Sequence, residues 1–325
     1  MCVTCGCGKP GETRIEGDPH GDHEHILADG TRVVHRHEHA HGGERSHDHA
    51  FFAHDHPHDH GEHTHAHGHS HTHDHEHSEH AAHANVLAPP GGGRPPLRQQ
   101  QPAEMVQLEL AVLDKNQRIA ERNRGWLGGR GVLALNMMSS PGAGKTTLLV
   151  RTLTDLADEM PMGVIEGDQE TTADADRIRA TGARAIQINT GAGCHLEADM
   201  LARALQALSP SAGSIVFVEN VGNLVCPALF DLGERARIVV LSVTEGEDKP
   251  LKYPHMFRSA QLMLLTKTDL APHVRFDADR AEHNARAVNP QIQCLRVSAE
   301  SGAGLDGWYA WLRSMRAELS LQVAS

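Results

Sequence analysis

The sequence has few aromatic residues and no long apolar run. Only 3% of its 325 residues are Phe, Trp or Tyr, and no apolar segment reaches the roughly 18 residues that a membrane-spanning helix requires. The N-terminus lacks the basic and hydrophobic segments of a signal peptide, and Lys and Arg form no basic patch of the kind that binds nucleic acid. We therefore expect a cytoplasmic protein that neither inserts into membranes nor binds nucleic acid.

Cysteine is also scarce, with six residues in the chain. In a reducing cytosol these thiols stay mostly free, which favours metal ligation over a disulfide framework. Cys2, Cys5 and Cys7 are crowded at the N-terminus, and with a fourth donor they suit Zn²⁺ in tetrahedral or Ni²⁺ in planar geometry. The alternative is a redox-active Cys-x-x-Cys pair, but such pairs lie where a strand meets a helix. We predict a metal-binding tip at residues 1–8.

Histidine is abundant instead, and 23 of the 27 histidines lie between His20 and His83. Apolar residues are too sparse there to bury a core, so we expect the region 9–88 to be disordered without metal. It can bind several ions, each weakly because binding must order a flexible chain. The alternative is a solvated linker whose histidines have no function. A linker rich in Pro and Gly, residues 89–103, separates this region from the remainder.

The remainder of the chain, residues 104–320, has the pattern of a nucleotide-binding domain. An apolar run at 133–138 leads into a loop of small residues, and leucines at helical spacing follow, which is typical of a strand, a phosphate loop and a helix. Ser139 stands where the usual motif has Gly, so an ordinary glycine-rich turn is the alternative. The residues predicted to hold the phosphates and Mg²⁺ are Gly142, Ala143, Gly144, Lys145, Thr146 and Thr147.

Apolar runs alternate with helix-length segments along this domain, and a long helix is expected at 105–124. This alternation predicts an α/β fold with a doubly wound, mainly parallel sheet. Ligands of such sheets bind at the carboxyl ends of the strands, so the residues directly after each run are the functional candidates. The remaining runs fall at 163–165, 185–188, 214–218, 238–243, 262–265 and 294–297.

Several of these strand ends carry residues suited to Mg²⁺ and guanine. Asp168 can bind Mg²⁺ directly or through water, and Glu219 is the acidic residue expected at the Mg²⁺ side of a phosphate loop. Lys267 and Asp269 follow a later run, and the Asp269 carboxylate can accept two hydrogen bonds from guanine N1–H and N2–H₂. GTP is therefore the predicted nucleotide, with Lys145 and Asp168 as the catalytic residues.

Further metal-ligand residues follow two other strands. Cys194 and His195 come after the run 185–188, and Cys226 comes after 214–218, so the three could meet as a Cys₂His set with an open coordination position. The alternative is a core thiol beside a histidine that caps a helix. Cys294 lies inside an apolar strand and is expected to be a packed thiol.

These motifs together resemble the HypB family of hydrogenase maturation GTPases. The resemblance covers the N-terminal tip and residues 104–320, and its most specific element is the run Glu-Asn-Val-Gly-Asn-Leu-Val-Cys-Pro at 219–227. It implies a P-loop GTPase of the SIMIBI type that forms a GTP-dependent homodimer and delivers Ni²⁺ to the large-subunit precursor of [NiFe]-hydrogenase. It also implies a HypA-type nickel chaperone as a partner, with SlyD as another.

The same resemblance implies roles for individual residues. The N-terminal cysteines would form a tight nickel site, and Cys194, His195 and Cys226 a weaker nickel or zinc site at the dimer interface. Lys249 would reach the nucleotide of the neighbouring subunit. Two alternative functions remain. A urease-type nickel chaperone would not carry the cysteine tip, and a nickel storage protein with a vestigial nucleotide domain would not need an intact phosphate loop, although storage and delivery can coexist.

Overall fold

The computed structural model describes residues 14–15, 23–26, 32–35, 102–169 and 172–324. The cysteine tip, most of the histidine-rich region and residues 89–101 of the linker lie outside the described residues. Three short strands are described within the region 9–88. One of them joins the main sheet, and the other two pair with each other; they are β1 (Arg14–Ile15), β2 (His23–Ile26) and β3 (Arg32–His35).

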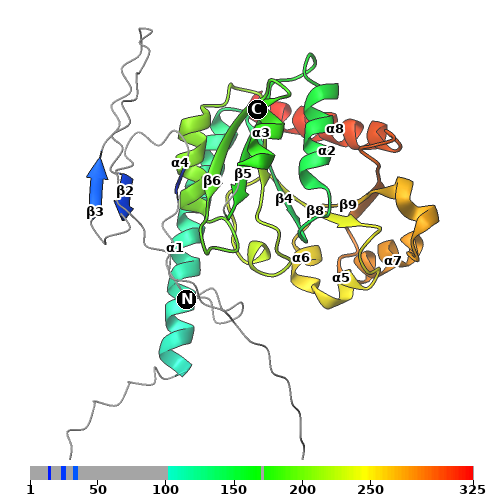
Figure 1. Ribbon diagram of the computed structural model, residues 1–325, viewed down its shortest axis with the longest axis horizontal. Helices are drawn as coiled ribbons and strands as arrows, with labels where there is room; N and C mark the ends of the chain where they lie inside the picture. Colours follow the sequence, from blue (N-terminus) through cyan, green and yellow to red (C-terminus); the bar gives the residue numbers. More distant parts are fainter. Residues whose placement is uncertain (1–13, 16–22, 27–31, 36–101, 170–171, 325) are drawn as a thin grey trace, which may run out of the picture. The chain divides into compact units, whose positions relative to one another are not determined.

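The main sheet confirms the predicted doubly wound α/β fold. Its strand order is β1-β6-β5-β7-β4-β8-β9-β10; seven strands run parallel, and only β1 pairs antiparallel, with β6. The phosphate-loop strand β4 is central, and the chain fills first one side of it and then the other (Figure 1). The parallel strands are β4 (Leu133–Ser139), β5 (Met162–Asp168), β6 (Arg184–Asn189), β7 (Ile215–Glu219), β8 (Ala236–Ser242), β9 (Leu262–Thr266) and β10 (Gln293–Arg296).

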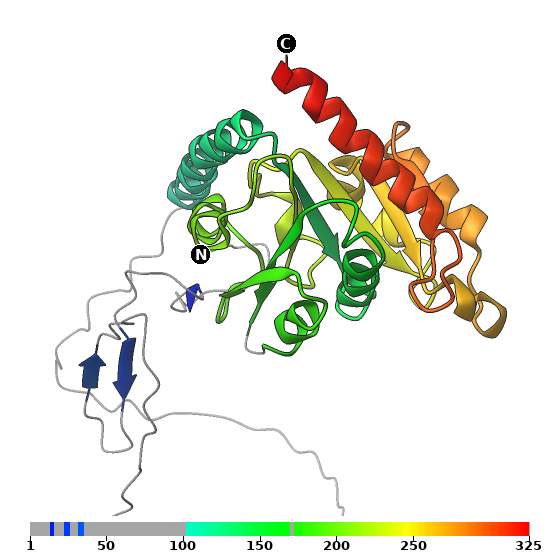
Figure 2. The same ribbon diagram turned by 90° about the horizontal axis from the view of Figure 1, so that it is seen from above.

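Helices cover both faces of the sheet because each central strand is apolar on both sides. Leu133 and Leu135 of β4 face one core, shared with Trp308, whereas Ala134 faces another, shared with Leu201. Figure 2 shows the two layers of helices from above. The first layer is α2 (Lys145–Asp155), α3 (Ala173–Arg179) and α8 (Leu305–Ala324); the second is α1 (Pro102–Gly129) and α4 (Ala198–Leu208), continued beside β8 and β9 by α6 (Pro254–Arg258) and α7 (Ala278–Val288).

Shorter elements complete the chain at the carboxyl ends of the strands. They are the 3₁₀ helices η1 (Cys226–Ala228) and η2 (Thr268–His273) and the short helix α5 (Lys249–Lys252). Among the described residues, no helix is both long and apolar enough to cross a membrane.

Helix α1 is longer than the predicted 105–124 and is tied to the domain by buried amides. Asn123 Nδ2 donates to Ala198 O at 2.8 Å and to Leu232 O at 3.0 Å. The close approach of α1 requires Gly233, which has a φ of 92°, because a Cβ there would lie 2.4 Å from Ala120 O. Helix α1 therefore packs against both the start of α4 and the loop before β8.

Candidate nucleotide and metal sites

The phosphate loop joins β4 to α2 and turns through two glycines in the left-handed region. Gly142 has a φ of 72° and Gly144 a φ of 94°, a conformation that other residues adopt only with strain. Lys145 Nζ donates to Ser139 Oγ at 2.7 Å. Ser139, which departs from the usual glycine, thus holds the lysine at the start of α2, where backbone N–H groups favour phosphate.

The loop borders a cavity of about 420 Å³. The structure brings most of the predicted nucleotide residues to this cavity, namely Gly142, Ala143, Gly144, Lys145, Thr146, Thr147, Asp168, Glu219 and Lys267. Three further charged residues line the cavity and were not among the predicted site residues: Glu166, Asp174 and Arg177. Glu166 lies in β5 near Asp168 and so carried the same signal, whereas Asp174 and Arg177 belong to α3, where charged residues usually face solvent.

Two buried carboxylates stand beside the loop threonine. Thr146 Oγ1 donates to Glu219 Oε1 at 2.8 Å, and Glu166 lies opposite Glu219 on the neighbouring strand. Oε2 of each glutamate is buried without a hydrogen-bond partner among the described residues. Burial is the main cause that raises the pKa of Glu166 to about 8 and that of Glu219 to about 6. It also lowers the pKa of Lys145, an effect that Glu219 opposes.

These unpaired oxygens fit Mg²⁺ better than they fit a closed protein core. Unpartnered buried carboxylate oxygens are costly, and Mg²⁺ binds through hydroxyl and carboxylate oxygens while keeping several water ligands. Thr146 and Glu219 can hold the ion, with Asp168 within reach at the same strand edge. The buried Glu219 Oε2 would then gain a partner, which none of the described residues supplies.

The predicted guanine-binding residues lie at the end of β9. Lys267 has a φ of 58° and its Nζ donates to Gly142 O at 2.7 Å. Asp269 belongs to η2 and accepts from Ser298 Oγ at 2.5 Å. Asp269 is not among the residues that line the cavity, and Ser298, which orients its carboxylate, was not predicted.

Lys249 lies at the start of α5 and contacts acidic groups of its own chain. Its Nζ is 3.6 Å from Glu245 Oε2, which also accepts from Ser140 Oγ at 2.5 Å. The lysine is therefore linked to the first turn of the phosphate loop within one subunit. Its contact with the nucleotide of a neighbouring subunit stays a prediction.

The structure brings Cys194, His195 and Cys226 together. Their ligand atoms all lie within 4.8 Å of one another, and the Cys194 Sγ is 3.6 Å from His195 Nδ1. The His195 ring stacks on Phe230 with centroids 3.9 Å apart. Burial lowers the pKa of His195 to about 4, so its imidazole is neutral at pH 7, which is the form that binds a metal.

A second observation also fits a metal at this set. His195 Nε2 is buried and has no hydrogen-bond partner among the described residues; Glu197 Oε1 lies 3.9 Å away, beyond hydrogen-bond distance. Two thiols and a neutral imidazole are the donors of an open Cys₂His site. Cys294 lies apart from this set, in β10.

One segment of chain connects the two sites. Glu219 lines the nucleotide cavity and Cys226 begins η1, while Gly222 between them packs against the phosphate loop. A Cβ at Gly222 would lie 3.0 Å from backbone and ring atoms of Pro141. A movement of the phosphate loop would therefore displace the segment that carries the metal ligand Cys226.

Comparison with known proteins places this geometry in a family. Residues 133–296 match the model of the CobW/HypB/UreG nucleotide-binding domain. The hydrogenase maturation factor HypB of Escherichia coli (strain K12) is 46% identical over 316 residues, which are 97% of this chain and 99% of the relative. Two solved structures are each 38% identical with a TM-score of 0.59: HypB of Archaeoglobus fulgidus, covering 62% of this chain and 99% of that one, and HypB of Helicobacter pylori in complex with nickel, covering 63% and 96%. With a nucleotide-binding domain of this type and such extensive identity, the chain belongs to the HypB family of hydrogenase maturation factors.

Proposed function

We propose that this protein is a GTP-hydrolysing nickel chaperone, which binds Ni²⁺ and delivers it to the large-subunit precursor of a [NiFe]-hydrogenase in the cytoplasm. The observation that carries the proposal is the shared segment between the sites. Glu219 lines the nucleotide cavity, Gly222 packs on Pro141, and Cys226 stands beside Cys194 and His195. Nucleotide state and metal binding are thereby connected through a few residues of chain.

Hydrolysis transfers the terminal phosphoryl group of GTP to water and yields GDP and phosphate. Lys145 and the N–H groups at the start of α2 stabilise the negative charge of that group. Thr146 and Glu219 would hold Mg²⁺, with Asp168 bound directly or through water, and the ion would supply positive charge against the phosphates. Asp269 and Lys267 select guanine. Hydrolysis is slow in the monomer and depends on a GTP-bound homodimer, in which Lys249 of the partner subunit approaches the nucleotide.

Nickel is the cargo in this proposal. Two cysteines and one histidine leave a fourth coordination position open to a donor from another molecule, so an ion at Cys194, His195 and Cys226 can be passed on. A HypA-type nickel chaperone is the proposed immediate partner, and SlyD is another. Zn²⁺ suits the same donors, and we assign nickel as cargo from the HypB of Helicobacter pylori, which was solved with nickel.

The decisive experiment measures coupling between nucleotide and metal. Ni²⁺ is titrated into the full-length protein in the presence of GDP, or of a GTP analogue with Mg²⁺, and sedimentation records the oligomeric state. We expect dimers with the GTP analogue and a Ni²⁺ affinity that differs between the two states. A monomer in both states with one unchanged affinity would overturn the proposal.

A storage function is the second candidate, and the concentration of 23 histidines between His20 and His83 favours it. Deleting that segment is expected to remove several weak Ni²⁺ equivalents and to impair hydrogenase output mainly when nickel is scarce. Replacing Cys2, Cys5 and Cys7 by Ser should instead remove the tightest equivalent. If the deletion alone abolished the tightest equivalent, the histidine region rather than the tip would be the main nickel site.

A further inference from the structure

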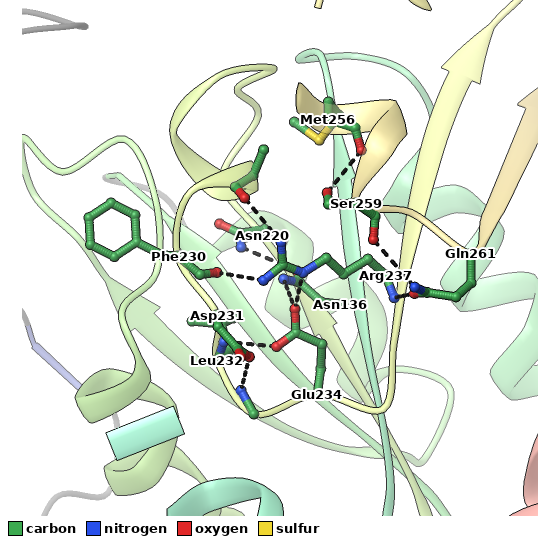
Figure 3. Close-up of polar contacts among 12 residues, drawn as sticks. Asn136, Asn220, Phe230, Asp231, Leu232, Glu234, Arg237, Met256, Ser259 and Gln261 are labelled. Atoms are coloured by element: carbon green, nitrogen blue, oxygen red, sulfur yellow. Dashed lines mark hydrogen bonds and ion pairs between the residues drawn. The ribbon is translucent and has the colours of Figure 1, made fainter. Parts of the chain in front are cut away.

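A polar network joins Asn136 of the phosphate-loop strand β4 to Arg237 of β8 (Figure 3). Asn220 Nδ2 donates to Asn136 Oδ1 at 3.2 Å, and Asn136 Nδ2 donates to Glu234 Oε1 at 3.2 Å. Arg237 Nε donates to the same Glu234 oxygen at 2.6 Å. We call these residues, Asn136, Asn220, Glu234 and Arg237, the Arg237 network. They come from β4, the end of β7, the loop before β8, and β8 itself.

One end of the Arg237 network holds the segment that begins at Cys226. Arg237 Nη1 donates to Ala228 O at 3.0 Å, and Nη2 donates to Phe230 O at 3.3 Å. Ala228 is the last residue of η1, whose first residue is Cys226. The Phe230 ring stacks on His195. Arg237 thus acts on Cys226 through a backbone turn and on His195 through an aromatic ring.

The other end holds the loop that carries Cys194 and His195. Asn220 Oδ1 accepts from Leu196 N at 3.2 Å, and Leu196 directly follows His195. Asn220 Oδ1 also accepts from Val221 N at 3.0 Å, so it fixes the start of the segment that leads to Cys226. Both metal-bearing segments are therefore attached to one chain of hydrogen bonds.

The composition of the network argues for a function beyond packing. The side chains of Arg237 and Glu234 are 15% and 2% exposed, and burying such a pair gives little or no net stability over apolar residues of the same volume. The pair instead fixes the positions of the groups bonded to it, because a planar guanidinium binds several acceptors in one fixed geometry. Here two of those acceptors are carbonyls of the segment that begins at Cys226.

We infer that Arg237, supported by Glu234, Asn136 and Asn220, is a positioning residue that holds Cys226 and His195 at ligating distance before the metal binds. The inference rests on the proposed function insofar as it takes Cys194, His195 and Cys226 as a metal site. Arg237 acts through its hydrogen bonds to the Ala228 and Phe230 carbonyls. Losing such an outer partner typically weakens metal binding about 10- to 100-fold.

The test uses the full-length chain with Cys2, Cys5 and Cys7 replaced by Ser. The thiolate-to-metal absorption band of bound Ni²⁺ then reports on Cys194 and Cys226, because histidines give no such band. Arg237→Met is compared with Arg313→Met, which removes an Arg–Glu pair elsewhere, formed by two hydrogen bonds from Arg313 of α8 to Glu159. Circular dichroism and thermal unfolding check the fold of each variant.

We expect Arg237→Met to weaken Ni²⁺ binding at least about tenfold and to change the shape of the band, while Arg313→Met leaves both unchanged. Arg237→Lys keeps the charge beside Glu234 but cannot bond both carbonyls, so it should also weaken binding. This milder variant decides the question if Arg237→Met does not fold.

The outcomes separate the inference from the function on which it rests. If the parent protein shows no band, or shows one that persists in Cys226→Ser, the proposed metal site itself is wrong. If the band is present but its affinity and shape are unchanged in a folded Arg237→Met, or failing that in Arg237→Lys, the positioning role is wrong and the metal site stands.

Discussion

The nucleotide pocket and the metal set differ in how their residues are brought together. The phosphate loop of the pocket consists of residues 142–147, neighbours in the chain, and Lys145 has a protein partner in Ser139. The metal set takes its ligands from two separate segments, and their spacing depends on the Arg237 network. The phosphate loop is thus fixed by local sequence and the metal set by tertiary contacts, and each should be breakable without the other.

Lys145→Ala should have the largest effect and should break only the nucleotide pocket. It removes the charge that meets the phosphates and leaves the buried Glu219 without its cation, so a loss of about 4 kcal/mol in GTP affinity, about 1000-fold, is expected. Titration with a fluorescent GTP analogue measures it. The Ni²⁺ band of Cys194 and Cys226 should persist, and retention of GTP affinity within tenfold would contradict the assigned role.

Cys226→Ser is the matching way to break only the metal set. Replacing a thiolate by a hydroxyl removes a ligand outright, so Ni²⁺ binding at this set should fall by about 100-fold or more, since even the loss of an outer partner costs about 10- to 100-fold. GTP affinity in the absence of metal should stay within about twofold. A parallel loss of GTP binding would show that the two sites are one cooperative structure, contrary to the comparison above.

Asp269→Asn should separate the contribution of base recognition to GTP affinity from the contribution of phosphate binding. Two hydrogen bonds to a charged acceptor, at about 1.5 kcal/mol each or more, are lost or weakened, so GTP affinity should fall about 100-fold. Xanthosine triphosphate should gain, because its ring carbonyl accepts from the new amide. Equal competition by ATP and GTP in the unchanged protein would refute guanine selection by Asp269.

The fold was predictable from sequence because its signals are local. Each apolar run became a parallel strand within a few residues, and the glycines and Lys145 marked the strand, loop and helix. The exact ends of the elements were not predictable. Helix α1 extends to Gly129 because Leu127 in its last turns is buried in the core shared with Ala134 and Leu201. The pairing of Arg14 and Ile15 with β6 has no periodic signal in so short a strand.

For the candidate metal set, the proximity of the three residues was easier to predict from the sequence than the contacts that position them. The proximity of Cys194, His195 and Cys226 followed from the rule that strand ends share one edge. The Arg237 network could not be predicted from the sequence, because an arginine within a strand usually indicates an edge or surface position. The burial of Arg237 depends on its hydrogen bonds to Glu234 and to two backbone carbonyls. Likewise the raised pKa of Glu166 follows from burial beside Glu219, a cross-strand contact that spacing alone does not reveal.

A substitution of Cys294 is expected to have the smallest effect on Ni²⁺ and GTP binding, so this residue serves as a control thiol outside both sites. Burial raises its pKa to about 11 from a usual value of 9.0, so at pH 8 its thiolate fraction, and hence its alkylation rate, should be about 100-fold below that of an unperturbed thiol. The raised pKa means that the folded state favours the protonated thiol. Its contribution to stability is therefore complete below about pH 9 and is lost as the pH rises through about 11.

Cys294→Ser should remove that alkaline loss while leaving both sites intact. The thermal midpoint of the parent protein should fall more steeply between about pH 9 and pH 11 than that of the variant, whereas Ni²⁺ and GTP affinities of the two should agree within about twofold. Thermal scans across this range, paired with the two titrations at pH 7.5, measure the difference. A change in Ni²⁺ stoichiometry in Cys294→Ser would place this thiol in a metal site and so contradict the contrast between packed and ligating cysteines.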